Sequence, residues 1–176
     1  MLKLDLGAIK LVGFDVDGVL TDGRIIIDDE GRESKNFHSR DGLGLKILLR
    51  AGLEAVLITG RASRLLEIRA RGLGLTEIYQ GVEDKWAVFE EVLKKKGLSP
   101  AQAAFAGDDL IDLPVMARVG LALAPADAAP DVLAAAHFVA PAPGGRGAVR
   151  QMIEFLLKGQ GRWDEVLRSY LPPAPA

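Results

Sequence analysis

The sequence predicts an α/β domain in which one parallel β-sheet lies between two layers of helices. Short apolar runs alternate with amphipathic helical stretches along most of the 176-residue chain, a pattern typical of a parallel sheet with helices on both faces. The residues are 49% hydrophobic, which suffices to fill the core of one domain. Neither an internal repeat nor a linker divides the chain. Residues 1–171 are therefore expected to form a single domain, followed by a flexible, proline-rich tail over residues 172–176.

Apolar runs mark the expected strands of this sheet, and amphipathic stretches between them mark the expected helices. The strands are Leu11–Val16, Ala55–Thr59, Glu77–Tyr79, Ala103–Ala106, Gly120–Leu123 and His137–Val139. The helices are Leu43–Arg50, Ser63–Arg71, Lys85–Lys96, Leu110–Arg118, Ala128–Ala135 and Gly147–Leu157. Ser99–Gln102 has the pattern of a capped single turn. In folds of this kind ligands bind at the carboxyl ends of the strands, so the residues that follow each strand are the candidates for a functional site.

One segment, residues 24–37, departs from the alternation. Two short β-like runs, Arg24–Ile27 and Glu33–Phe37, flank the turn-forming residues Asp28–Gly31, which predicts a projecting β-hairpin. An isolated hairpin is marginally stable in water, and this one is half apolar. It is expected to pack against another subunit, and folding back on its own domain is the alternative.

Charge and composition argue against several classes of function. The 22 basic and 24 acidic residues give a net charge of −2. The chain therefore lacks the excess of basic residues that would indicate nucleic acid or an anionic membrane as a partner. The absence of cysteine excludes disulfides and thiolate chemistry. No apolar run reaches the ~20 residues of a membrane helix, and the opening MLKLDLGAIK lacks the apolar core of a signal peptide. These features predict a cytoplasmic protein.

Two aspartates follow the first expected strand, in Asp15-Val16-Asp17-Gly18. Residues two apart in an extended chain point the same way, so both carboxylates can face one cavity. Two such charges about 4 Å apart repel by roughly 4 kcal/mol at an effective dielectric constant of 20. A fold keeps the pair together only with a cation or a proton between the carboxylates; otherwise the segment is a solvated turn.

Two further signals supply groups that bind an anion. Thr59-Gly60-Arg61 ends an expected strand with a hydroxyl and begins a helix, where backbone N–H groups favour anions, although Thr-Gly also forms ordinary strand-to-helix turns. Lys85 lies at the start of another expected helix, where its charge opposes the helix dipole. An anionic partner would explain that placement, and a solvated surface lysine is the alternative.

An acidic cluster, Gly107-Asp108-Asp109-Leu110-Ile111-Asp112, follows the strand expected over Ala103–Ala106. Carboxylates grouped in this way suit a hard divalent cation such as Mg²⁺, which prefers oxygen ligands. The helix dipole alone favours an aspartate in a first helical turn. It accounts for Asp109 more easily than for three carboxylates together.

Together, these signals contain the groups that phosphoryl transfer requires. Asp15 would attack phosphorus, Asp17 would act as acid and base, Thr59 and Lys85 would hold the phosphoryl oxygens, and a metal would screen the charge. The sequence resembles the haloacid-dehalogenase-like phosphatases, whose four motifs match Asp15–Gly23, Thr59–Arg61, Lys85 and Gly107–Asp112. Between about Leu11 and Leu157 it resembles, more narrowly, the 3-deoxy-D-manno-octulosonate 8-phosphate (KDO 8-phosphate) phosphatases, in Phe37–Gly44, Leu113–Met116 and Gly144–Arg150.

The resemblance implies a Mg²⁺-dependent phosphatase for a keto-sugar-acid phosphate, above all KDO 8-phosphate, in lipopolysaccharide precursor synthesis. It implies that Asp15 forms an aspartyl-phosphate, while Asp17 protonates the leaving sugar oxygen and then activates water. Mg²⁺ would be held by Asp15, the backbone carbonyl of Asp17 and Asp108, with Asp112 in support. The implied substrate contacts are Asp17, His38, Ser39, Arg40, Asp41, Gly42, Lys46, Arg61, Arg69 and Lys85.

The resemblance also implies a three-layer, Rossmann-like fold without the cap domain that covers the site in larger members. The intervals from Asp17 to Thr59 and from Thr59 to Lys85 are already filled by the expected hairpin, helices and strands. An uncovered site admits water and selects substrates poorly. The resemblance implies a homotetramer in which neighbouring hairpins help to cover each site.

Three alternatives come from other classes or substrates. A response-regulator receiver also combines aspartates, a threonine, a lysine and Mg²⁺, but its acidic pair precedes the phosphorylated aspartate, and the order here is different. A non-catalytic oligomerisation module with this fold would not need all four motifs. Within the phosphatases, a nonulosonate 9-phosphate is the alternative substrate, and the sequence does not separate the two sugars.

Overall fold

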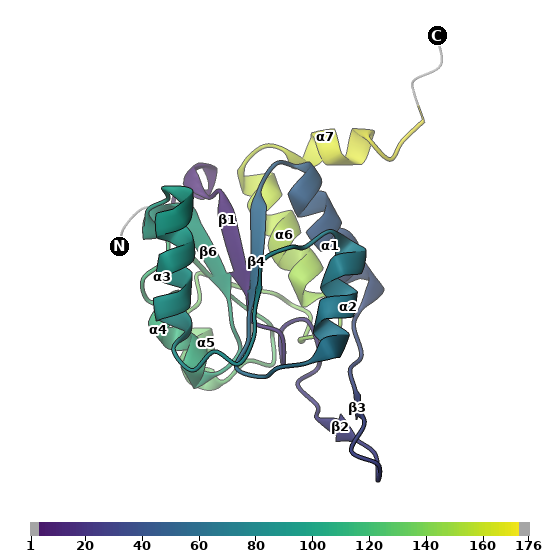
Figure 1. Cartoon of the computed structure of the whole chain (residues 1–176). Helices are drawn as coiled ribbons and strands as arrows, with labels where there is room; N and C mark the ends of the chain where they lie inside the picture. Colours follow the sequence, from purple (N-terminus) through teal and green to yellow (C-terminus); the bar gives the residue numbers. More distant parts are fainter. Residues whose placement is uncertain (1–3, 173–176) are drawn as a thin grey trace.

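The computed structural model describes residues 4–172 and places one parallel sheet between two layers of helices (Figure 1). The six strands lie in the order β5-β4-β1-β6-β7-β8, and each neighbouring pair is parallel. Their bounds are β1 Leu11–Phe14, β4 Glu54–Ile58, β5 Ile78–Tyr79, β6 Ala103–Ala106, β7 Leu121–Ala124 and β8 Phe138–Val139. The predicted α/β fold is confirmed.

The helices differ from the prediction mainly at their ends. The α-helices are α1 Ser39–Arg50, α2 Arg64–Leu73, α3 Lys85–Lys96, α4 Leu113–Met116, α5 Pro130–Ala135, α6 Ala148–Gly159 and α7 Trp163–Arg168, and the 3₁₀ turns are η1 Leu6–Ala8, η2 Pro100–Gln102 and η3 Leu110–Asp112. The single helix predicted over Leu110–Arg118 is divided into η3 and α4, because Pro114 lacks the N–H that a continuous helix needs there. Helix α7 was not predicted.

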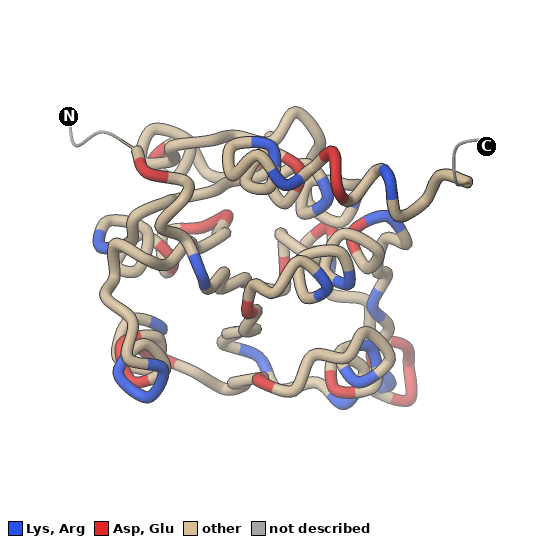
Figure 2. Tube along the Cα trace, turned by 90° about the horizontal axis from the view of Figure 1, so that it is seen from above, with Lys and Arg blue, Asp and Glu red and all other residues tan. Residues whose placement is uncertain are grey.

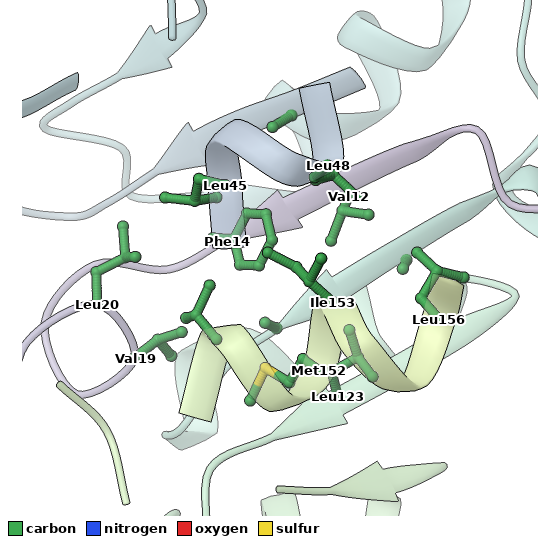
Figure 3. Close-up of a cluster of buried hydrophobic side chains, with 14 of the residues drawn as sticks. Val12, Phe14, Val19, Leu20, Leu45, Leu48, Leu123, Met152, Ile153 and Leu156 are labelled. Carbon is green, nitrogen blue, oxygen red and sulfur yellow. The ribbon is translucent and has the colours of Figure 1, made fainter. Parts of the chain in front are cut away.

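Hydrophobic cores lie on both faces of the sheet. Val12 and Phe14 of β1 pack against Leu45 of α1 and Met152 and Ile153 of α6 (Figure 3). The opposite face carries a second core, to which Leu11, Phe105 and the α3 residue Phe89 belong. Because β1 is covered on both sides, all of its residues are buried, which accounts for its continuous apolar run.

The predicted hairpin is present and projects from the carboxyl edge of the sheet (Figure 1). Its paired strands, β2 Ile26–Ile27 and β3 Glu33–Ser34, are shorter than predicted. Ile25, Ile26 and Ile27 are 58%, 41% and 57% exposed, so these side chains do not fold back on the domain. Between Asp17 and Thr59 the chain forms only this hairpin, α1 and β4, and no cap domain is inserted there.

Charged residues of both signs are interspersed over the trace (Figure 2). Among residues 4–172, no helix is long and apolar enough to cross a membrane. The predicted tail over residues 172–176 lies outside the described residues, apart from Pro172.

Candidate active site

Three parallel strands deliver the candidate catalytic residues to one edge of the sheet. The register aligns the residues Phe14, Leu57 and Ala106 near their carboxyl ends. Asp15 follows the first directly, and Thr59 and Asp108 follow shortly after the other two. Because parallel strands end at a common edge, these three residues lie at the same edge of the sheet although they are far apart in the sequence.

Lys85 is a buried cation at the centre of this edge. Its ammonium nitrogen lies 2.8 Å from Oδ1 of Asp15 and 2.6 Å from Oδ1 of Asp112, and its side chain is 1% exposed. The other oxygen of Asp112 accepts the N–H groups of Asp108 at 3.0 Å and of Asp109 at 3.3 Å. Both oxygens of Asp112 therefore have partners within the protein, and this residue holds Lys85 and the backbone of Asp108 and Asp109 in place.

The carboxylates of Asp15, Asp108 and Asp112 form a cluster that fits a metal ion. One oxygen of each lies within 4.8 Å of those of the others. Oδ1 of Asp108 is buried and has no hydrogen-bond partner among the described residues. An all-oxygen donor set with one such open oxygen matches the ligand preference of Mg²⁺.

Burial, together with the neighbouring carboxylates, raises the pKa values of two carboxyl groups in this cluster. Burial, followed by the charge of Asp112, raises the pKa of Asp15 to about 6 against the attraction of Lys85. Burial and then the charges of Asp15 and Asp112 raise the pKa of Asp108 to about 8. Burial by itself would lower the pKa of Lys85, but the two carboxylates beside it raise that pKa above its ordinary value. The site therefore holds more negative charge than Lys85 neutralises, as a cation site does.

Gly18 allows the loop after β1 to pass beside Asp108. Its φ of +95° lies in the left-handed region, and a Cβ at this position would lie 2.0 Å from Oδ2 of Asp108. A side chain here would both strain the backbone and displace the carboxylate. The glycine of the Asp-x-Asp-Gly motif thus serves the acidic cluster as well as the turn.

Asp17 lies beside the cations Lys35 and Arg61, whereas Asp15 lies beside Lys85. The Arg61 side chain is partly exposed to solvent, and this side of the site is called the entrance. Oδ1 of Asp17 pairs with the ammonium of Lys35, which follows β3 of the hairpin. Its Oδ2 is 3.8 Å from Nε of Arg61 and is buried without a hydrogen-bond partner among residues 4–172. Lys35 was missed in the sequence, where only its spacing of two from Glu33 on an expected strand indicated that both could point into one site.

Comparisons with known proteins agree with this geometry. A family model of haloacid dehalogenase-like hydrolases matches residues 57–153. The 3-deoxy-D-manno-octulosonate 8-phosphate phosphatase KdsC of Escherichia coli (strain K12) is 46% identical over 157 residues, which cover 89% of this chain and 84% of that protein. The chain belongs to this phosphatase family. KdsC of Yersinia pestis is 47% identical over 154 residues, covering 88% of this chain and 82% of that protein.

Solved structures of this phosphatase family have the same fold. The Yersinia pestis phosphatase has a TM-score of 0.89 at 45% identity, with 91% of this chain and 86% of that chain covered. The Moraxella catarrhalis phosphatase, solved in complex with a magnesium ion, a phosphate ion and a KDO molecule, has a TM-score of 0.92 at 36% identity, with 95% and 96% covered. The resemblance found in the sequence motifs is confirmed.

Several predicted substrate contacts of the family lie where a ligand could reach them. The Arg61 side chain is 44% exposed at the entrance, beside Asp17. Ser39 and Arg40 are exposed in the first turn of α1, and His38 before them is partly buried. Lys46 is partly buried on α1, and its side chain has no hydrogen bond or ion pair within residues 4–172.

Asp41 is placed differently, because its carboxylate binds the start of α6. The residue is 1% exposed. Its Oδ2 accepts the N–H of Gly147 at 3.0 Å, and its Oδ1 accepts the N–H of Arg150 at 2.8 Å. These bonds satisfy helix N–H groups that lack an intrahelical partner. A direct contact of Asp41 with substrate stays a prediction, and the geometry favours a role in joining α1 to α6.

Arg69 and Gly42 pack against each other under the loop that precedes α1. A Cβ on Gly42 would lie 2.2 Å from a guanidinium nitrogen of Arg69. The same nitrogen donates to the carbonyl of His38 at 3.5 Å, and the guanidinium lies 5.8 Å from the ring centroid of Phe37. Arg69 therefore holds this loop, and its contact with substrate also stays a prediction.

Proposed function

We propose that this protein hydrolyses the phosphate ester of KDO 8-phosphate with Mg²⁺, in lipopolysaccharide precursor synthesis, and that residues 1–171 form a single phosphatase domain. The observation that carries the proposal is the separation of the two motif aspartates. Asp15 lies beside buried Lys85 in the metal-fitting cluster, whereas Asp17 lies among cations at the entrance. One carboxylate is thereby suited to attack phosphorus and the other to transfer protons. The identity to the E. coli phosphatase supports the choice of substrate.

The proposed reaction has two displacement steps at phosphorus. A carboxylate oxygen of Asp15 attacks phosphorus, the bond from phosphorus to the sugar oxygen breaks, and Asp17 gives its proton to that oxygen. An aspartyl-phosphate and KDO result. Asp17 then takes a proton from a water molecule, whose oxygen attacks phosphorus while the bond to Asp15 breaks. Inorganic phosphate leaves, Asp15 is again a carboxylate, and Asp17 again carries the proton with which it began the reaction.

The remaining site residues bind charge in this proposal. Lys85 and the buried Thr59, 3% exposed, hold phosphoryl oxygens. The metal would be held by Asp15, the backbone carbonyl of Asp17 and Asp108, with Asp112 in support. Mg²⁺, when bound, would neutralise negative charge and so reduce the repulsion between a carboxylate nucleophile and a phosphate ester. Arg61 would meet the carboxylate of the sugar acid at the entrance.

We further propose that the protein acts as a cytoplasmic homotetramer that requires neither nucleic acid nor a membrane. The exposed isoleucines of the hairpin support the assembly, because three adjacent apolar side chains, 41% to 58% exposed, gain free energy when a second copy covers them. The candidate site has no cap domain of its own. A neighbouring subunit could therefore supply the cover that excludes water.

Phosphate release from a panel of sugar phosphates tests this function. KDO 8-phosphate, a nonulosonate 9-phosphate and a hexose 6-phosphate would each be assayed with Mg²⁺ and again after exhaustive chelation. We expect the highest kcat/KM on KDO 8-phosphate, loss of activity on chelation, and recovery with Mg²⁺ or Mn²⁺. A preference for the nonulosonate 9-phosphate would make that ester the substrate in place of KDO 8-phosphate. No turnover of any ester would favour the non-catalytic alternative. Undiminished activity after chelation would contradict the requirement for Mg²⁺.

A further inference from the structure

Lys35 is a hairpin residue whose side chain ends inside the candidate active site. Its neighbours Ser34 and Asn36 are exposed, but the Lys35 side chain is only 3% exposed. Its ammonium pairs with Oδ1 of Asp17 and lies 3.6 Å from Oε1 of Glu33. Burying an ammonium group is costly unless it is paired, so these carboxylates fix where the lysine can lie.

Glu33 joins the same strand to the start of α2. Its Oε1 accepts a hydrogen bond from Arg61 at 3.1 Å, and its Oε2 accepts one from the hydroxyl of Ser63 at 2.9 Å. Lys35 follows β3 directly and is two residues from Glu33, and both side chains reach the site, where Lys35 contacts Asp17 and Glu33 contacts Arg61. The hairpin is thereby anchored at the entrance, and Lys35 is held over Asp17.

We propose that Lys35 is a positioning residue for Asp17, holding Oδ1 so that Oδ2 stays directed at the oxygen of the leaving sugar. The two oxygens of Asp17 differ in this respect, since Oδ1 is paired with Lys35 and Oδ2 is buried with no hydrogen-bond partner in the described part of the chain. Fixing one oxygen removes the rotation that would carry the other out of line. The proposal rests on the proposed function, in which Asp17 transfers protons.

The surroundings of Lys35 separate this role from substrate binding. Arg61 is 44% exposed and able to meet a ligand, whereas the ammonium of Lys35 is buried against Asp17 and Glu33. Removing Lys35 should therefore impair transfer of the proton to the leaving group more than it impairs affinity. That difference distinguishes a positioning residue from a binding residue.

The test compares two phosphate esters with a Lys35→Met variant, which keeps much of the length and removes the charge. The sugar oxygen of KDO 8-phosphate needs a proton as it leaves, whereas the aryl oxygen of 4-nitrophenyl phosphate leaves without one. For KDO 8-phosphate we expect kcat/KM to fall about 10- to 100-fold with little change in KM, and for the aryl ester a fall in kcat/KM of less than about threefold. Lys35→Arg should restore part of the loss.

The matched control is Arg32→Met, which removes a hairpin cation that pairs with Asp28 and Glu30 at the turn. It should leave both esters unchanged. An equal loss on the two esters in Lys35→Met, a rise in KM alone, or no change would each overturn the proposal. If thermal melting shows that Lys35→Met is unfolded, Lys35→Gln replaces it, with the same selective loss expected and an equal loss again contradicting the role. Wild-type turnover of KDO 8-phosphate in the same assays tests the proposed function separately.

Discussion

Replacing Asp15 by asparagine should abolish phosphate release and stabilise the metal-free protein. The amide is nearly the same shape as the carboxylate but is a poor nucleophile. Burial and then Asp112 raise the pKa of Asp15 from 3.8 to about 6, a difference that corresponds to about 3 kcal/mol of unfavourable free energy when the group is ionised. Asparagine removes this charge and keeps a carbonyl acceptor for Lys85, 2.8 Å away. The net gain should be about 1–3 kcal/mol, or roughly 2–10 °C in Tm for a domain of this size.

The gain should depend on pH in a defined direction. Below about pH 4, Asp15 is protonated in both the folded and unfolded states, so the substitution gives no advantage. Between about pH 4 and 6 the unfolded chain loses its proton first, and the wild type becomes less stable relative to Asp15→Asn as the pH rises. Burial and the neighbouring carboxylates raise the pKa of Asp108 to about 8. The metal-free wild type should therefore continue to lose stability up to about pH 8.

Calorimetry at pH 5 and pH 8 in the presence of a chelator measures this effect. The Tm difference between Asp15→Asn and the wild type should be larger at pH 8 than at pH 5. Added Mg²⁺ should raise the Tm of the wild type more than that of the variant, because a ligand stabilises the state that binds it. A lower Tm for Asp15→Asn at pH 8 in chelator would contradict this prediction, because it would show that the ion pair with Lys85 outweighs the burial and crowding of the carboxylates. Phosphate release by the folded variant would refute the assignment of the nucleophile.

Arg61→Ala should lower kcat/KM on KDO 8-phosphate by about 10- to 150-fold and leave kcat/KM on acetyl phosphate nearly unchanged. Equal effects on the two substrates would exclude sugar-acid recognition by Arg61. Arg69→Ala should mainly lower Tm. Asp41→Ala should destabilise the protein by about 1–3 kcal/mol, because N–H groups of α6 lose their acceptor, and an unchanged urea midpoint would contradict this role. Ile26→Asp should dissociate the proposed tetramer, while Ile68→Asp, which alters a side chain 60% exposed on α2, should not. Light scattering measures both masses, and a tetramer of Ile26→Asp would count against packing by the hairpin.

Helix ends were predictable where local chemistry defines them. Helix α3 has the predicted bounds, because Asp84 caps its start by accepting the N–H of Ala87 at 3.0 Å, and Gly97 ends it in the left-handed conformation. Helix α1 begins at Ser39, before the predicted Leu43. Its first turn carries no apolar periodicity. The contact that secures this turn joins Asp41 to α6, far along the chain.

The candidate substrate residues show the same limit. The family resemblance placed Asp41 and Arg69 among the contacts of the substrate, but both Asp41 oxygens accept N–H groups and one guanidinium nitrogen of Arg69 donates to the carbonyl of His38. Lys35 belongs to none of the motifs, and the fold of the hairpin places its ammonium beside Asp17. A motif identifies residue types that a family keeps, and the same type can serve packing, binding or positioning according to the atoms that surround it.

The order of apolar runs was enough to predict the sheet and to place Asp15, Thr59 and Asp108 at its carboxyl edge, because each follows an apolar strand and parallel strands end together. The pairing of the charges could not be read from the sequence and became visible in the fold. Lys85 is buried between two carboxylates, and Lys35 holds the aspartate that Lys85 does not reach. Periodicity specifies which face a residue occupies, but the strength of an ion pair depends on the distance between charged atoms and on their exclusion from water. Both quantities are set by segments that are distant in the sequence and adjacent in the fold.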